Sequence, residues 1–566
     1  MSASGHGTAC TSTNSKLPVP LDPIPYNEPL PFRRQIAFRA AFLAMNHDIE
    51  LALAAAQRSF NAGQLDEAAS LLHTILASVP DHGEALAGLG AIAARQGDHM
   101  RAAEYLTRPS ATTFMSVDQL NFAAQVCQSA QRHDDAIALF ERCLAQFPNH
   151  AASLYGAAMS LIQRGELQRS LAMLEHLCKV QPLSAEAHYN RGALLGTMER
   201  YDDELDAYRQ AIALKPRFVR AYVNLGVALR DLSRFDEALL QFKKALSLDP
   251  NDVGARTNRA QTNLLLGEFE HGWREYEWRW RDGTGSHGFP QNTLWTGAQP
   301  VTGKTVLVHH EQGFGDTLQF VRFVDRLSAA GARVVLRVQD ALLPLLRHYR
   351  GAAEVIGETA PVPHFDYHIP IMSLPFALKI RAADLATLAP YVHADEALLR
   401  QWDDLFADSD RQLKIGIVWS GSTTHLNDRN RSIPLAQLKP LLDADVRFFS
   451  LQQEVRESDH ACFAQLEQRG RLRDVSARLT TFAQTAALIA RLDLVISVDT
   501  AVAHLAGALG KPVWIALPFM PDWRWQLERN DSPWYAQARL FRQTTRGDWT
   551  GVVAALRAQI DAVRHA

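Results

Sequence analysis

The sequence predicts an α-solenoid of helical repeats followed by an α/β region made of two halves. Two observations carry this prediction. Prolines and small residues recur every 34 positions before residue 282, and short apolar runs alternate with helical patterns after residue 303. Residues 283–303 are rich in Gly, Pro and Thr, and are predicted to be the linker between the two regions.

The composition is that of a globular protein. The chain has 566 residues, of which 47% are hydrophobic and 21% charged, with a formal net charge of -3. This charge gives no reason to expect a nucleic-acid or anionic-membrane partner. Five scattered cysteines without a CxxC pair are typical of a reducing compartment. No apolar run has membrane-span length and no secretory signal is visible, so a cytoplasmic location without stable membrane insertion is expected.

Three series of residues in phase identify the repeats. Proline stands at Pro148, Pro182, Pro216 and Pro250, each 34 residues after the last, with Pro80 twice 34 before the first. Small residues recur with the same period, from Ala56 and Gly90 to Gly226 and Ala260, and from Ala68 to Ala238. This pattern is typical of tetratricopeptide repeats, in which small residues let two antiparallel helices pack closely and proline ends the second helix. The sequence predicts about seven repeats within residues 48–282, after a disordered lead-in at residues 1–32.

Two repeats depart from the pattern. Pro109 falls where a helix of the second repeat should continue. The seventh repeat, residues 255–282, loses its terminal proline and gains aromatic residues. A changed last repeat is expected where a solenoid caps itself or docks on another domain.

Asparagines form a further series in the repeats. Asn190, Asn224 and Asn258 differ by 34 residues and lie in the first helix of successive repeats. An asparagine side chain both donates and accepts, so this ladder is a candidate site for the backbone of an extended acceptor peptide. The alternative is that these side chains bond their neighbours within the repeats.

The pattern of apolar residues after residue 303 predicts nine strands that alternate with helices. They are Lys304–His309, Arg333–Val338, Ala353–Ile356, Tyr367–Ile371, Lys414–Trp419, Val446–Leu451, Leu494–Val498, Pro512–Leu517 and Arg539–Arg542. Such alternation indicates βαβ units and parallel sheets. The strands fall into two Rossmann-like halves, residues 304–400 and 412–566, with ligand sites expected beyond the carboxyl ends of the strands.

The first loop of interest is Glu311-Gln312-Gly313-Phe314-Gly315-Asp316. It lacks the third glycine of a dinucleotide fingerprint and the Gly-Lys-Ser/Thr of a phosphate-binding P-loop. Asp316 therefore has two interpretations: a carboxylate that caps a helix, or a catalytic base in a turn whose glycines admit substrate.

Two further loops are candidates for donor binding. Asp499, Thr500 and His504 open a helix of small residues after a strand, and the exposed amides of such a helix start suit a phosphate. Ser420 and Gly421 follow another strand, and Arg431 comes soon after them with a side chain suited to phosphate. The alternatives are a capped helix with a buried histidine, and salt bridges at the surface.

A fourth loop contains Pro521-Asp522-Trp523-Arg524-Trp525. Its aromatic and cationic side chains can stack on a base or sugar, or form a plug between domains. No cluster of His, Cys and carboxylates indicates a metal site, so neither a metal nor another cofactor is expected.

Three motifs occur in this order along the chain: Gly-x-Gly-Asp at residues 313–316, basic-x-apolar-Pro at residues 431–434 and Asp-Thr-x-x-x-His at residues 499–504. Together they resemble the heptosyltransferase-like glycosyltransferases of family 9, which have the GT-B fold. Repeats joined to such a domain are similar to bacterial repeat-containing glycosyltransferases, some of which modify flagellin. The layout is also similar to that of O-GlcNAc transferase. The resemblance covers residues 48–545.

The resemblance implies a role for each matching residue. Asp316 matches the general base that acts on the acceptor hydroxyl, and Thr500 and His504 match the helix at the donor phosphate. Arg431 stands where the family usually has a lysine, and Ala501 replaces the usual glycine of Asp-Thr-Gly. These two departures concern donor binding.

The sequence therefore predicts a metal-independent GT-B glycosyltransferase. It would transfer a sugar from a nucleotide-sugar to a hydroxyl of a protein, flagellin being one candidate, that the repeats recruit. One alternative is an inactive interaction scaffold. The other is a transferase that acts on lipopolysaccharide or another glycan.

Overall fold

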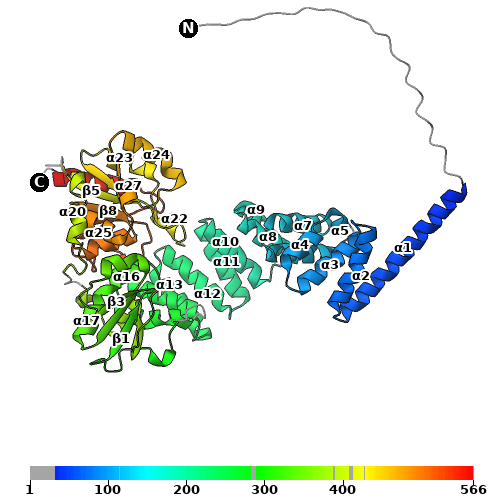
Figure 1. Cartoon of the computed structure of the whole chain (residues 1–566), viewed down its shortest axis with the longest axis horizontal. Coiled ribbons are helices and arrows are strands. Elements are labelled where there is room, and N and C mark those ends of the chain that lie inside the picture. The colour runs from blue at the N-terminus through cyan, green and yellow to red at the C-terminus, as the bar shows by residue number, and fades with distance from the viewer. Residues whose placement is uncertain are drawn as a thin grey trace, which may run out of the picture. The chain divides into compact units, whose positions relative to one another are not determined.

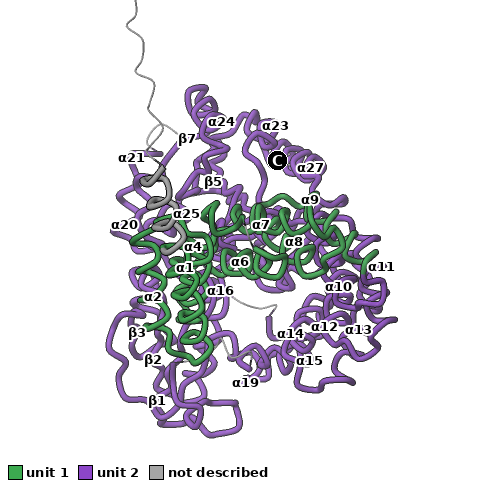
Figure 2. Tube along the Cα trace, turned by 90° about the vertical axis from the view of Figure 1, so that its right-hand side faces the viewer, with its two compact units in different colours: residues 1–180 green, residues 181–566 purple. Residues whose placement is uncertain are grey.

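The structure is a computed structural model that describes residues 32–113, 115–281, 288–385, 389–406, 412–425 and 427–564. Residues 1–31 of the predicted lead-in and residues 283–287 of the predicted linker lie outside these ranges. The chain divides into two compact units, residues 1–180 and 181–566, which Figure 2 shows in different colours. The elements are labelled in Figure 1.

Within the residues described, the first unit is built of helices. They are α1 (Phe32–Asn61), α2 (Leu65–Ser78), α3 (Gly83–Arg95), α4 (His99–Leu106), α5 (Pro109–Thr113), α6 (Val117–Ser129), α7 (His133–Gln146), α8 (Ala151–Gln163) and α9 (Leu167–Val180). Helix α4 stops at Leu106, and Pro109 begins the separate short helix α5. The interruption predicted for the second repeat is therefore confirmed.

The second unit opens with the last three repeats. Their helices are α10 (Ala185–Thr197), α11 (Tyr201–Leu214), α12 (Val219–Asp231), α13 (Phe235–Leu248), α14 (Val253–Leu265) and α15 (Phe269–Tyr276), followed by the 3-10 helix η1 (Glu277–Arg281). The predicted packing role of small residues is visible in each unit. In the second unit, a Cβ on Gly226 would lie 2.6 Å from a ring carbon of Phe242, so α12 and α13 can approach only because the side chain is absent. In the first unit, Ala124 and Ala136 are fully buried.

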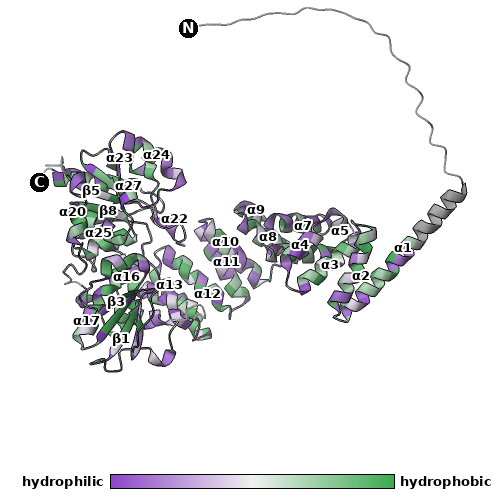
Figure 3. Cartoon of the chain, viewed as in Figure 1, coloured by the Kyte–Doolittle hydropathy of each residue, from purple (hydrophilic) through white to green (hydrophobic). Residues whose placement is uncertain are grey.

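The first sheet follows the repeats. Its strands are β1 (Thr305–His309), β2 (Arg333–Val338), β3 (Glu354–Gly357) and β4 (Tyr367–Pro370). They are all parallel and lie in the order β3-β2-β1-β4. In Figure 3 the strands near the β1 and β3 labels have hydrophobic colours, as expected for a sheet that helices cover.

The second sheet has six strands. They are β5 (Lys414–Val418), β6 (Arg447–Ser450), β7 (Arg473–Asp474), β8 (Leu494–Val498), β9 (Val513–Leu517) and β10 (Ala538–Arg542). All are parallel, in the order β10-β9-β8-β5-β6-β7. The chain leaves β5 toward one edge and later returns to β8 on its other side. Parallel sheets bind ligands at such a switch point.

The helices of the α/β region are mostly short. They are α16 (Phe314–Phe320), α17 (Val324–Ala329), α18 (Leu343–Leu346), α19 (Leu374–Ala377), α20 (Glu396–Arg400), α21 (Asp403–Phe406), α22 (Asp428–Arg431), α23 (Lys439–Leu442), α24 (Glu457–Gln468), α25 (Phe482–Arg491), α26 (Ala501–Ala508) and α27 (Thr550–Arg564). Within the part of the chain that the structure describes, no helix combines the length and apolar character needed to span a membrane.

All nine predicted strands are present, and each end lies within one residue of its prediction. The sequence missed β7, which has two exposed residues and no apolar run. From residue 288 onward the predicted linker is packed in place. Leu294 forms a parallel bridge with His368, and the Trp295 N–H donates to the His368 carbonyl over 2.9 Å.

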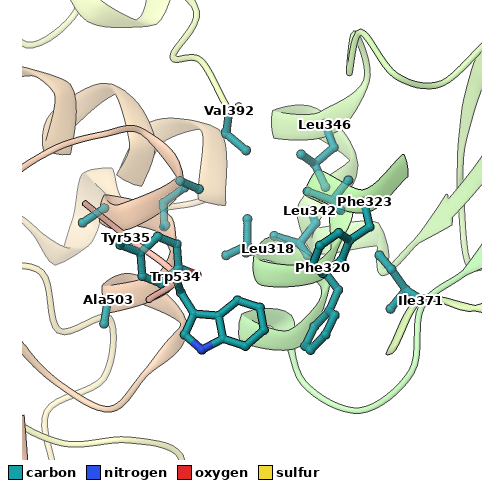
Figure 4. Packing of buried hydrophobic residues seen from close by; sticks show 14 of the residues in the cluster. Leu318, Phe320, Phe323, Leu342, Leu346, Ile371, Val392, Ala503, Trp534 and Tyr535 are labelled. Atoms are coloured by element: carbon teal, nitrogen blue, oxygen red, sulfur yellow. The ribbon is translucent and has the colours of Figure 1, made fainter. Parts of the chain in front are cut away.

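The last repeat docks on the α/β region. Trp273 of α15 packs edge-on against Phe320 of α16 and against Trp523, with ring centroids 6.1 and 5.3 Å apart. Phe269 meets Trp534 in the same way. Figure 4 shows the neighbouring core, where Trp534 and Tyr535 approach Leu318 and Phe320. Of the two alternatives expected for the altered seventh repeat, capping or docking, the structure shows docking.

An ion pair continues this junction. Arg279 of η1 donates to both carboxylate oxygens of Glu311, over 3.0 and 2.8 Å. Both side chains are less than a tenth exposed. Glu311 also accepts the Met372 N–H over 3.0 Å, which ties the pair to the end of β4. The repeats thus end against the residue that opens the Gly313-Phe314-Gly315 loop.

Candidate active site

Loops at the carboxyl edges of the two sheets converge on one cleft. They include the loops that follow β1, β5, β6, β8 and β9. The cleft consists of two cavities of about 1380 and 1340 Å³. Both cavities are lined by Asp316, Arg431, Asp499, Asp522 and Arg524, so they share one wall.

Asp316 lies at the third position of α16, and both of its carboxylate oxygens are engaged. Oδ2 accepts the N–H of Gly313, the residue before the helix, over 2.8 Å. Oδ1 pairs with Arg524, which comes from the other half of the α/β region. Burial raises the pKa of Asp316, while Arg524 and the Gly313 N–H act in the opposite direction.

Gly315, the glycine directly before Asp316, serves helix packing. A Cβ on Gly315 would lie 2.9 Å from Cδ2 of His504, which belongs to α26 in the other half. The absent side chain therefore lets α16 and α26 meet. The expectation was that the glycines admit substrate; at Gly315 the close neighbour is a histidine of the protein itself.

His504 is buried and only 4% exposed. Its Nδ1 lies 2.8 Å from the Tyr535 hydroxyl, and its ring stacks on Trp525 with centroids 5.3 Å apart. Burial lowers the pKa of His504 well below its usual value, and nearby arginines lower it further. The imidazole is therefore neutral at physiological pH. It contributes to the wall of one cavity and stands 3.9 Å from Asp499 through Nε2.

Thr500 is the residue before α26, but its hydroxyl does not cap the helix. The hydroxyl instead lies 3.0 Å from Ser497 Oγ. Thr500, Ala501 and Val502 line the cavity at the start of this helix, where the partial positive charge of a helix favours an anion. Burial raises the pKa of the neighbouring Asp499 to about 6.

Arg431 joins the loops after β5 and β8. Its Nη1 donates to the Asp499 carbonyl over 2.9 Å. Its guanidinium lies against the backbone of Gly421, where a Cβ would come within 2.7 Å of Cζ. Any larger residue at position 421 would displace this guanidinium from its place in the wall.

Buried polar atoms without partners mark the same wall. Within the residues described, Ser420 Oγ, Arg431 Nε and Arg456 Nε have no hydrogen-bond partner. Ser420, Arg431 and Arg456 all line the cavity beside α26. Arg431 Nε lies 3.6 Å from Asp428 Oδ1, at ion-pair distance. Buried polar groups are normally satisfied, so a wall with unsatisfied polar atoms suits a polar ligand. Arg456 had no signal in the sequence, because it follows no recognisable motif.

The sequence also missed the main partner of Asp316. Arg524 belongs to the 3-10 helix η9 (Trp523–Trp525) that follows β9, and it was considered for stacking on a ligand. The structure supports the alternative, a plug between the halves. Trp523 and Trp525 are buried, and Arg524 reaches across to Asp316 and to Gln319 of α16.

The asparagine ladder lies away from these cavities. Asn190, Asn224 and Asn258 are half-buried, as the structure places them, and none lines the cleft. Asn224 donates to the Tyr189 hydroxyl over 3.0 Å, and Asn258 accepts from Arg230 over 3.1 Å. At least two of the three side chains therefore bond their neighbours within the repeats.

The repeats nevertheless contribute to the cleft. Arg230 of α12 and both Gln261 and Leu265 of α14 line the same cavity as Asp316. Arg429, beyond the loop after β5, pairs with Glu199 of the α10–α11 turn over 3.0 Å. No group of three or more metal-ligating side chains is found among the described residues.

Family models match segments of the repeats and a segment of the α/β region. Residues 441–517, from α23 to β9, match glycosyltransferase family 9 (heptosyltransferase). Four segments match tetratricopeptide repeat families: residues 53–110, 128–194, 185–218 and 219–252. Protein FlbA of Caulobacter vibrioides is 26% identical over 503 residues, which cover 84% of this chain and 78% of that protein.

Solved structures of tetratricopeptide repeat proteins are similar to part of this chain. A tetratricopeptide repeat protein from Parabacteroides merdae is 17% identical and covers 43% of this chain and 96% of its own, with a TM-score of 0.33. YrrB, described as a tetratricopeptide repeat protein with an unusual peptide-binding site, is 20% identical and covers 32% of this chain and 92% of its own, with a TM-score of 0.27. The family matches and the two parallel sheets show that the chain combines tetratricopeptide repeats with a glycosyltransferase family 9 (heptosyltransferase) domain. This combination supports glycosyltransferase activity.

Proposed function

We propose that this chain is a metal-independent GT-B glycosyltransferase of the cytoplasm that transfers a sugar from a nucleotide-sugar to a hydroxyl of a protein. One observation carries the proposal. Asp316 from the first sheet and the Arg431–Asp499 contact from the second line one cleft, at the carboxyl edges of both sheets. A base and a phosphate-binding group that line the same cleft are what a sugar transfer requires.

The donor binds beside the second sheet. Its phosphates lie at the start of α26, near Thr500, where the Arg431 guanidinium and the Ser420 hydroxyl supply donors. Gly421 keeps the Arg431 guanidinium flat against the backbone. These groups stabilise the negative charge that develops on the leaving phosphate.

Asp316 removes the acceptor proton. The acceptor oxygen forms a bond to the anomeric carbon, the bond from that carbon to the phosphate oxygen breaks, and the nucleotide leaves with the electron pair. A carboxylate offers about four lone-pair directions, so Asp316 can bind a hydroxyl while it also accepts from Gly313 and Arg524. His504 is neutral and buried, and therefore shapes the site rather than adding a positive charge.

The protein acceptor approaches along the repeats. The cavity that contains Asp316 is bounded by Arg230, Gln261 and Leu265 of the last two repeats. Asn258 accepts from Arg230, which connects the asparagine ladder to this wall. Asn190 and Asn224 are proposed to contact the acceptor farther from the reacting hydroxyl.

A donor screen tests the proposal first. Thermal unfolding of the full chain is measured with UDP-, GDP-, CMP- and ADP-sugars. One class is expected to stabilise the protein by about 2.7 kcal/mol at 100 times its dissociation constant, and Arg431→Ala is expected to abolish that shift. If no nucleotide-sugar shifts the unfolding temperature, the inactive scaffold becomes the better interpretation.

Asp316→Asn then tests the base. We expect the donor-induced stabilisation to remain, and turnover to fall by about 10² to 10⁴-fold. Turnover is measured as transfer of labelled sugar in an extract of the cells that make this protein. Near wild-type turnover would contradict the role of Asp316. Label that resists protease and partitions with lipid would identify a glycan acceptor instead of a protein.

A further inference from the structure

Arg524 is held in place from several sides. Its Nε donates to Gln319 Oε1 over 2.7 Å, its Nη1 donates to Asp522 Oδ1 over 2.8 Å, and its Nη2 pairs with Asp316. Its carbonyl accepts the Trp534 indole N–H over 2.8 Å. The guanidinium lies 4.2 Å from the centre of the Trp523 ring. The side chain is only 8% exposed, so it cannot move into solvent or exchange hydrogen-bond partners freely.

The pair with Asp316 connects the two halves of the α/β region. Asp316 and Gln319 belong to α16 after the first sheet, whereas Arg524 belongs to η9 after the second. Oδ2 of Asp316 accepts the Gly313 N–H and Oδ1 accepts from Arg524. These two contacts hold the carboxylate in one orientation at the shared wall of the cleft. An acceptor hydroxyl can reach only the lone pairs that these two contacts leave free.

We propose that Arg524 is the positioning residue that keeps Asp316 ionised and aimed for proton removal. This inference rests on the proposed role of Asp316 as the base. Arg524 acts through the carboxylate and is not itself a catalytic residue.

The charges around Asp316 explain why such a residue is needed. Asp522 and Glu311 are negative and act against ionisation of Asp316, as burial does. Glu311 is neutralised by Arg279, and His504 is uncharged. Arg524 is the cation that contacts the carboxylate within the described part of the chain. The remaining titratable or charged side chains that line the cavity shared with the repeats are Glu199, Arg230, Asp231, Tyr276, His425, Asp428, Arg429, Arg431, Arg456, Asp459, Asp499 and Arg546.

Chemical labelling of the full chain tests this inference without any substrate. An aryl diazoacetamide esterifies protonated carboxyl groups, and peptide mass spectrometry reads the labelling of Asp316 between pH 4 and pH 8. The pH midpoint of labelling reports the pKa of Asp316. Arg524→Gln is expected to raise the midpoint by about one to three units, because an adjacent arginine lowers the pKa of an aspartate by that amount. Arg524→Lys, which keeps the charge, is expected to restore most of the difference.

Two matched variants separate electrostatics from loosened packing. Asp522→Asn removes a negative charge beside Asp316 and is expected to lower the midpoint. Arg322 is also buried and also joins the halves, through the Trp534 carbonyl at 2.7 Å and the Tyr391 hydroxyl at 2.6 Å. Arg322→Gln is therefore expected to reduce thermal stability and leave the midpoint unchanged.

The outcomes distinguish this inference from the proposed function. An unchanged midpoint in Arg524→Gln, or an equal shift in Arg322→Gln, overturns the role of Arg524. If Arg524→Gln does not fold, an unchanged midpoint in Asp522→Asn overturns it instead. Full turnover by Asp316→Asn refutes the base, whatever the labelling shows. If the role is correct, the acid limb of the turnover profile of Arg524→Gln moves to higher pH together with the labelling midpoint.

Discussion

Asp316 was predicted to be either a helix cap or a catalytic base, and the structure shows that it caps its helix while its second oxygen stays available for another partner. Capping and catalysis were expected to compete for one carboxylate, yet the structure assigns one oxygen to Gly313 and the other to Arg524. The position of Asp316 followed from its place after the first strand. Its partner could not be inferred, because Arg524 lies 208 residues away and only the packing of the two halves brings them together.

At the same scale, the two glycines before Asp316 should differ in their tolerance of alanine. Gly315→Ala places a Cβ 2.9 Å from His504 Cδ2, so α16 and α26 must separate. Overpacking of this kind costs about 1–3 kcal/mol, and we expect a lower unfolding temperature and weaker donor binding. Gly313→Ala is the control. Its Cβ would meet Asp316 Oδ2 at 3.3 Å, and its backbone is extended at φ -83° and ψ 171°. Equal unfolding temperatures would contradict the packing role of Gly315.

At the scale of elements, the 34-residue period and the apolar runs predicted most of the architecture. The strands after residue 303 were found because their residues are buried and β-rich, as in β8 and β9. The pattern does not say which strands lie next to each other in a sheet. Nothing in the local sequence places β5 beside β8, yet this adjacency brings Arg431 to the Asp499 carbonyl. Arg456 was missed for the same reason, and Arg524 was singled out without Asp316 as its partner.

Helix α11 carries a buried carboxylate where most repeats have alanine. Glu204 is 9% exposed and lies against Gly196, and burial raises its pKa to about 7. A carboxyl group with a raised folded-state pKa binds its proton more tightly in the folded protein. Its contribution to stability is therefore full below about pH 4.5 and is lost as pH rises through about 7.

We therefore expect Glu204→Gln to raise the free energy of unfolding at pH 8 and to change it little at pH 4.5. The gain at pH 8 should reach at most about 3 kcal/mol, since one pKa unit corresponds to about 1.4 kcal/mol. Denaturant unfolding at the two pH values measures this. The exposed Glu237 of α13, in the following repeat, provides the control, and Glu237→Gln should show no such gain at pH 8.

At the scale of the molecule, the last repeat shares a core with the α/β region. Trp273, Phe269 and Tyr276 pack on aromatic residues of both halves, and Arg279 binds Glu311 beside the loop that carries Asp316. From its lost proline and added aromatic residues, the sequence predicted that this repeat either caps the solenoid or docks on another domain. It did not reveal that the contact ends two residues before the Gly313-Phe314-Gly315 turn.

Arg279→Leu should destabilise the chain strongly. It leaves the Glu311 carboxylate buried without its cation, which typically costs 3–5 kcal/mol. The double variant Arg279→Leu/Glu311→Gln should recover much of the loss, because a neutral amide oxygen can still accept the Met372 N–H. Thermal unfolding measures both. Arg281→Leu, in the same 3-10 helix but exposed, should have little effect; a loss equal to that of Arg279→Leu would argue against the buried pair.

The shared core also sets where this protein can be recombined. The predicted repeats end at residue 282. A hybrid enzyme joined there would separate Phe269 and Trp273 from the aromatic residues that they contact in the α/β region, and would separate Arg279 from Glu311. Residue 180, the border between the two compact units, leaves these aromatic contacts and the ion pair on one side. An exchange of repeats should therefore keep α10–α15 in the same chain as the two sheets that follow them. Only the helices before α10 should be replaced.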